Sequence, residues 1–150
     1  MIRDDIKAAQ IAAMKAGDKE TRNAVSLIQA AIKNRDIEAR TGKAPESDDA
    51  LVVEVLQKMV KQRRESIEMY VKGGRQELAD AEAVEVAVIE RFLPQQMSED
   101  ETRAAINAIK GELGASGMKD MGRVIAELKA RHGTQLDMSK ASGLVKAALS

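Results

Sequence analysis

The stretch LVVEVLQKMVKQRRESIEMYVK, residues 51–72, decides the fold of this chain. Its apolar residues recur at spacings of three and four, so they lie on one face of a helix. These residues are Val52, Val55, Leu56, Met59, Val60, Ile67, Tyr70 and Val71. The face spans about 140°, which is wide enough to contact two partner helices. The stretch is therefore predicted to be the central helix of a bundle.

A single arginine interrupts this apolar face. Arg63 projects into its middle, whereas Lys58 and Lys61 point away from it. A buried guanidinium must contact an anion or reach water, because arginine does not lose its proton inside a protein. We therefore look for an acidic partner of Arg63 on a neighbouring helix.

Two glutamates of the next segment are candidates for that partner. Residues 75–92 are predicted to form a helix, and both Glu82 and Glu85 lie on its apolar face. If this helix packs antiparallel to the central one about Gly73, opposite residues have numbers that sum to about 148. We predict that Arg63 pairs with Glu85, with Glu82 as the second choice. The alternative is that all three side chains extend to water at the edge of the bundle.

Helical periodicity and capping residues divide the rest of the chain. Further helices are predicted at residues 2–16, 19–40, 98–111, 118–131 and 137–149. Met14 is expected on the inner face of the first helix, and Gly42 is expected to adopt the left-handed conformation after the second. Pro94 stops the helix of residues 75–92, and Ser98 with Glu101 has the spacing of a capping box.

These elements predict an all-α protein. No alternating strand pattern and no repeat period is visible in the sequence. The predicted architecture is a four-helix bundle at residues 1–94 followed by a three-helix bundle at residues 95–150, with the boundary at Pro94.

The composition narrows the possible functions. Aromatic residues make up 1% of the 150 residues and cysteine is absent, which excludes an aromatic platform for stacking bases, disulfides and thiolate metal sites. The 24 basic and 24 acidic residues balance, so contact with nucleic acid depends on local patches. The sequence has neither a signal peptide nor an apolar run of about 18 residues, so we expect a cytoplasmic protein without membrane contact.

The chain is poor in catalytic residues. His132 is its only histidine and lies at a helix end, where interaction with the helix dipole explains it. No spaced set of metal ligands and no phosphate-binding loop is present. The sequence therefore predicts no catalytic residue, no metal site and no cofactor.

Weak basic signals occur in both predicted bundles. Lys58 and Lys61 lie on the central helix, in a segment that lacks acidic residues. Basic residues recur toward the end of the chain, at Lys119, Arg123, Lys129, Arg131, Lys140 and Lys146. Exposed lysines on a helix are usually only solvated, so this pattern alone is weak support for nucleic-acid binding.

Three segments together resemble the YqeY proteins of the GatB/YqeY family. They are KMVKQRRESIEMY at residues 58–70, AEAVEVAVIERFLPQQMSEDE at residues 81–101 and LGASGMKDMGRVIAEL at residues 113–128. The resemblance implies a four-helix bundle joined to a three-helix bundle. The second bundle is similar to the tail domain of the B subunit of the tRNA-dependent amidotransferase, which is taken to help hold the tRNA.

The resemblance leaves three functions open. The first is a tRNA-binding accessory module in which Lys119, Arg123, Lys129 and Arg131 contact phosphates. Gly122 would then allow close approach of the backbone, unless it serves helix–helix packing. The second is an adaptor that binds a protein of translation. The third is the carbon–nitrogen ligase activity with glutamine as amide donor that the family label implies; it ranks last because the chain has no ATP loop and no Ser–Lys amidase signature.

Overall fold

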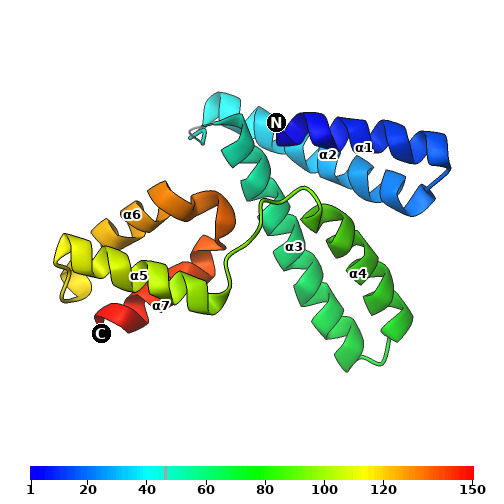
Figure 1. Cartoon of the computed structure of the whole chain (residues 1–150). Helices are drawn as coiled ribbons and strands as arrows, with labels where there is room; N and C mark the ends of the chain where they lie inside the picture. Colours follow the sequence, from blue (N-terminus) through cyan, green and yellow to red (C-terminus); the bar gives the residue numbers. More distant parts are fainter. Residues whose placement is uncertain (46) are drawn as a thin grey trace. The chain divides into compact units, whose positions relative to one another are not determined.

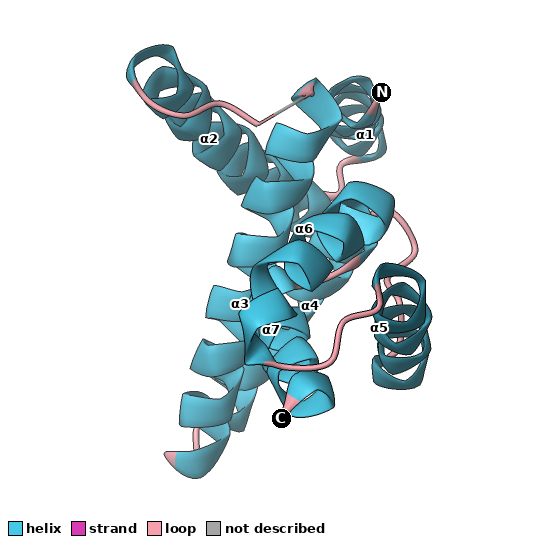
Figure 2. Ribbon diagram, turned by 90° about the vertical axis from the view of Figure 1, so that its left-hand side faces the viewer, coloured by secondary structure: helices cyan, strands magenta, loops and turns pink. Residues whose placement is uncertain are grey.

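The structure, a computed structural model, describes residues 1–45 and 47–150. This part of the chain is helical and contains no strand (Figures 1 and 2), which confirms the predicted all-α class. The long helices are α1 (Ile2–Ala16), α2 (Lys19–Thr41), α3 (Asp48–Lys72), α4 (Gln76–Glu90), α5 (Glu99–Leu113), α6 (Met121–His132) and α7 (Met138–Leu149). Two short 3-10 helices, η1 (Met118–Asp120) and η2 (Gly133–Gln135), flank α6.

Local hydrogen bonds fix the ends of these helices. Asp18 Oδ1 accepts from the Thr21 N–H at 3.1 Å at the start of α2, and such side-chain caps satisfy amides that have no partner inside the helix. Ser98 and Glu101 form the predicted capping box at the start of α5. The prediction for Gly42 was wrong: its φ of −132° and ψ of −160° are extended rather than left-handed.

Contacts divide the described chain into two compact units, Met1–Leu93 and Pro94–Ser150. Helices α1–α4 form the first and α5–α7 the second. Each has its own cluster of buried aliphatic side chains. No helix of the described residues is long and apolar enough to span a bilayer.

The core of the first unit lies where α1 and α2 pack on the N-terminal half of α3 (Figure 1). Val25, Val52 and Leu56 are fully buried there. Helix α4 runs antiparallel to α3 and extends with it beyond the α1–α2 pair. Because no other helix of the unit covers this far end, Val71 and Leu78 are 51% and 40% exposed, although Val71 was expected on the inner face of the central helix.

Met14 is a second apolar residue that the sequence placed wrongly. Its residue is 61% exposed, whereas Ile6 and Ala13 on the same helix are buried. Successive helical residues point about 100° apart, so Met14 lies beside the buried stripe rather than on it. The outer side of α1 therefore carries an exposed methionine.

Arg63 contacts the glutamate expected from the hairpin register. Its Nε donates to Glu85 Oε2 at 2.7 Å, and Glu82 lies at 4.0 Å. The Arg63 side chain is only 16% exposed. The next residue, Arg64, also reaches α4, where its Nη2 lies 2.6 Å from Glu90 Oε1. These two pairs join α3 to α4.

The second unit is a small bundle of three helices. Ile106, Ile109, Val124, Leu128 and Val145 form its fully buried centre. Two hydrogen bonds hold the first and last residues of this unit against its helices. The Met97 N–H donates to the Gln135 carbonyl at 2.9 Å, and Lys110 Nζ donates to the Ala148 carbonyl at 2.9 Å. The bundle therefore has its own closed aliphatic core, and the outer sides of α6 and α7 are exposed.

Candidate nucleic-acid interface

A buried carboxylate organises the turn between α5 and α6. Asp120 accepts from the Ser116 N–H at 3.1 Å and from Arg123 Nη2 at 2.8 Å. The bond from Ser116, followed by the bond from Arg123, lowers the pKa of Asp120. Arg123 Nη2 also donates to the Leu113 carbonyl at 3.5 Å. Arg123 thus holds this turn together, and its charge is already compensated.

Arg131 also forms ion pairs with carboxylates of its own unit. Its Nε donates to Glu127 Oε1 at 2.7 Å and its Nη2 to Glu112 Oε2 at 2.5 Å. The hydrogen bond from Arg131 lowers the pKa of Glu112. A phosphate that approached Arg131 would compete with two glutamates, so this arginine is a poor candidate for the predicted contact.

The two lysines of the predicted set are placed differently. Lys119 on η1 and Lys129 on α6 are exposed and make no ion pair within the described residues. On α7, Lys140 and Lys146 are exposed in the same way. We call the exposed parts of Lys119, Lys129, Lys140 and Lys146 the lysine surface of the second unit.

The lysine surface is positive because its helices carry few acids. Helix α7 contains no acidic residue, and Asp137, at its N-cap, bonds to Ser139. Helix α6 contains only Glu127, which is paired with Arg131. Most of the acidic residues of this unit lie on α5, chiefly in its first turn. Lys140 and Lys146 were not among the residues predicted to contact phosphates. The sequence signal that points to them is the absence of acids from residues 138–149.

Two glycines lie in exposed helical positions of this surface. A Cβ atom added at Gly122 or at Gly143 would meet nothing within 4 Å. Within the second unit, therefore, no helix packs against Gly122. Gly143 lies between Lys140 and Lys146, about one turn from each. The backbone of α7 is thus accessible between two cations.

The remaining predicted residues, Lys58 and Lys61, belong to the first unit. Both are exposed on α3. Lys58 lines a cleft of about 370 Å³ together with Arg35, Glu38 and Glu54. Because Glu54 lies 3.5 Å from Arg35, the acids of this cleft offset part of its positive charge.

Residues 3–149 match the family described as Yqey-like protein, which covers both units. The chain belongs to the YqeY-like family. Its curated relatives include proteins named altered inheritance of mitochondria protein 41, mitochondrial, in yeasts. The relative from Vanderwaltozyma polyspora is 28% identical over 80% of this chain and 64% of its own length.

Two further relatives carry the same name. The one from Eremothecium gossypii is 28% identical over 85% of this chain and 67% of its own length. The one from Meyerozyma guilliermondii is 28% identical over 91% of this chain and 71% of its own length. The YqeY-like chain thus spans about two thirds of the length of these relatives.

Proposed function

We propose that this YqeY-like protein is a tRNA-binding accessory module and that the lysine surface of its second unit contacts RNA phosphates. The observation that carries the proposal is the contrast within the predicted set. Lys119 and Lys129 are exposed and form no ion pair in the described part of the chain, although the charge of Lys119 helps to lower the pKa of Asp120, whereas Arg123 and Arg131 are held by acids. A cation without an internal partner can neutralise a phosphate and release its counterion, and this release drives non-specific binding.

The composition supports contact with the backbone rather than with bases. The chain has one tyrosine, one phenylalanine and no tryptophan, so stacking of unpaired bases has little support. Phosphate contacts fix position without reading sequence. An accessible backbone at Gly143, between two lysines, allows a phosphate to approach closely. The connection with tRNA and with amidation rests on the family resemblance to the amidotransferase tail domain.

The test is a titration of the full chain against unfractionated tRNA at two salt concentrations. We expect Lys129→Glu with Lys146→Glu to weaken binding about tenfold or more, and to reduce the slope of log affinity against log salt by about 2. The matched control is Lys43→Glu with Lys72→Glu, which makes the same charge change on the first unit. Equal affinities for the two double variants would show that the lysine surface is not the binding site.

The adaptor function is the second candidate, and an exposed surface of the first unit favours it, as argued below. The carbon–nitrogen ligase activity of the family label ranks third. It predicts that the purified chain releases ammonia from glutamine. Turnover that a single point substitution abolishes would place the chain among the enzymes and displace both binding functions.

A further inference from the structure

The outward side of the α1–α2 pair combines exposed apolar residues with cations. Two contacts fix how the helices align: Gln29 Nε2 donates to Gln10 Oε1 at 3.1 Å, and Arg3 Nη1 donates to Asp36 Oδ2 at 3.0 Å. In this antiparallel register, opposite residues have numbers that sum to about 39. The register identifies which exposed residues of α1 and α2 are neighbours.

An apolar centre lies on this side. Ile11 is 45% exposed and Met14 is 61% exposed. They are three residues apart, so they lie on the same side of α1. Across from them, α2 contributes the exposed small residues Ser26 and Ala30. The large apolar side chains on this side of the pair are therefore those of Ile11 and Met14 on α1.

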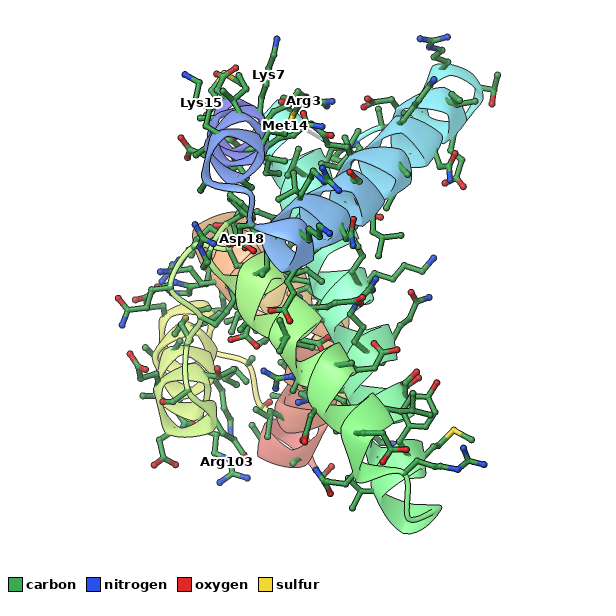
Figure 3. The ribbon with its side chains drawn as sticks, turned by 90° about the vertical axis from the view of Figure 1, so that its right-hand side faces the viewer. Arg3, Lys7, Met14, Lys15, Asp18 and Arg103 are labelled. Atoms are coloured by element: carbon green, nitrogen blue, oxygen red, sulfur yellow. The ribbon has the colours of Figure 1, made fainter. Side chains whose placement is uncertain are left out.

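Cations lie at both ends of the apolar centre. By this register Lys7 lies level with Lys33 at one end, and Lys15 lies near the level of Arg22 at the other. All four are exposed and make no ion pair within residues 1–45 and 47–150. Figure 3 shows Lys7, Met14 and Lys15 on the outer side of α1. Lys7 and Lys15 are eight residues apart, about 12 Å along the axis. We call these four cations with Ile11 and Met14 the α1–α2 face.

The acids close to the α1–α2 face do not neutralise it. Asp4 lies about one turn before Lys7 at the edge of the face. Asp18, in the turn between the helices, accepts hydrogen bonds from the Thr21 N–H and hydroxyl. These bonds lower the pKa of Asp18 and keep it charged, so it offsets one of the two cations at its end, as Asp4 does at the other. Asp36 is bound by Arg3. The face therefore keeps a positive charge at each end.

The mixture of residues favours one kind of partner. Nucleic acid would use the cations, but its phosphates gain nothing from Ile11 and Met14. An anionic bilayer would require a broader apolar side than two residues provide. A helix can satisfy both features at once, because residues seven or eight apart share one side of it.

We propose that the α1–α2 face binds an acidic amphipathic helix of a partner protein. Its glutamates or aspartates, about two turns apart, would pair with the Lys7–Lys33 and Lys15–Arg22 ends. Apolar residues between them would cover Ile11 and Met14. The apolar contact supplies part of the affinity, and the paired charges fix the register and speed association. This inference concerns the first unit and is independent of the tRNA proposal.

The probe is a synthetic helical peptide of about 18 residues with two leucines flanked on the same side by glutamates two turns apart. Binding to the full chain is followed by fluorescence anisotropy. We expect Ile11→Ser with Met14→Ser, and separately Lys7→Glu with Lys15→Glu, to weaken binding about tenfold. The matched controls, Met69→Ser with Val84→Ser and Lys43→Glu with Lys72→Glu, carry equivalent changes at exposed positions elsewhere and should bind the peptide normally.

Changes in the peptide test the same contact without altering the protein. Replacing its glutamates by glutamines should weaken binding to a similar extent and remove most of the salt dependence. No binding of the parent peptide, or binding that the α1–α2 variants leave unchanged, would overturn the proposal. So would a preference of the α1–α2 face for phosphatidylserine vesicles or for tRNA over the peptide. The variant Lys129→Glu with Lys146→Glu should bind the peptide normally even if the tRNA proposal fails.

Discussion

Arg63 lies between α3 and α4 with most of its side chain out of water. Its Nε donates to Glu85, and its Nη1 lies 3.4 Å from the Met59 carbonyl. Glu82 is too distant for a hydrogen bond but contributes negative charge. Arg63 is thus a largely enclosed charge of the hairpin. Its shortest contact with an acid is the one to Glu85.

Glu85→Ala is expected to lower the free energy of unfolding by about 2 kcal/mol. Removing one member of a buried pair costs about 3–5 kcal/mol, and an exposed pair contributes less than about 1. The Glu85 side chain is 34% exposed, which places this pair between the two limits. Urea denaturation monitored by circular dichroism measures the change.

Glu65→Ala provides the comparison for that experiment. Glu65 is exposed on the outer side of α3, so its loss should change stability by no more than about 0.5 kcal/mol. A loss for Glu85→Ala as small as for Glu65→Ala would mean that water already solvates Arg63.

At the scale of single elements, α7 is a helix that carries an unusual interior residue. Glycine in a helix costs about 0.5–1 kcal/mol relative to alanine, and no packing contact at Gly143 explains that cost. An exposed glycine between two lysines is instead what a close contact with a ligand would require. Helix stability therefore favours alanine at position 143, whereas close approach of a ligand favours glycine.

Gly143→Ala is expected to stabilise the protein by about 0.5–1 kcal/mol and to weaken tRNA binding. The stabilisation follows from the lower flexibility of the unfolded chain and the free space at Cβ. The weaker binding follows from the methyl group between Lys140 and Lys146. Thermal unfolding and the tRNA titration measure the two effects on one sample.

Gly114 supplies a control of opposite sign. It follows α5 with φ of 63°, a conformation that alanine adopts only with strain. Gly114→Ala should therefore destabilise the protein by about 1 kcal/mol. If Gly143→Ala stabilises the protein but leaves tRNA affinity unchanged, phosphates do not approach α7 at that position.

At the scale of the whole molecule, the two units have separate cores. The cluster of the first unit contains residues from α1 to α4, and that of the second contains residues from α5 to α7. The two proposed surfaces follow the same division, with the α1–α2 face on one unit and the lysine surface on the other. A protein built in this way can bind two different partners with separate helical surfaces.

The second unit, residues 94–150, is predicted to fold when it is produced alone. Its buried centre is closed by its own three helices, and the capping box of α5 lies within it. We expect a helical circular dichroism spectrum and a cooperative thermal transition, with low stability because small domains bury little surface. A spectrum without helical signal would show that its stability depends on residues 1–93.

The proposed tRNA site was only partly predictable. The basic residues and their clustering in the second unit were visible in the sequence, as was the resemblance that suggested tRNA. The acids three and four residues before the arginines, Asp120 for Arg123 and Glu127 for Arg131, were also visible as helical spacings. The pair of Arg131 with Glu112 on α5 was not visible, because it depends on how α5 and α6 pack. The open positions at Gly122 and Gly143 also required the packed structure.

The sequence by itself determined the helices, most of their caps and the Arg63–Glu85 contact. Periodicity, N-caps and the capping box depend on residues within about four positions of one another, and the contact of Arg63 follows from a tight hairpin. Only the tertiary structure decided that Met14, Val71 and Leu78 are exposed and that Arg131 also pairs with Glu112 on α5. Burial and pairing depend on which other helix covers a side, and residues distant in sequence determine that.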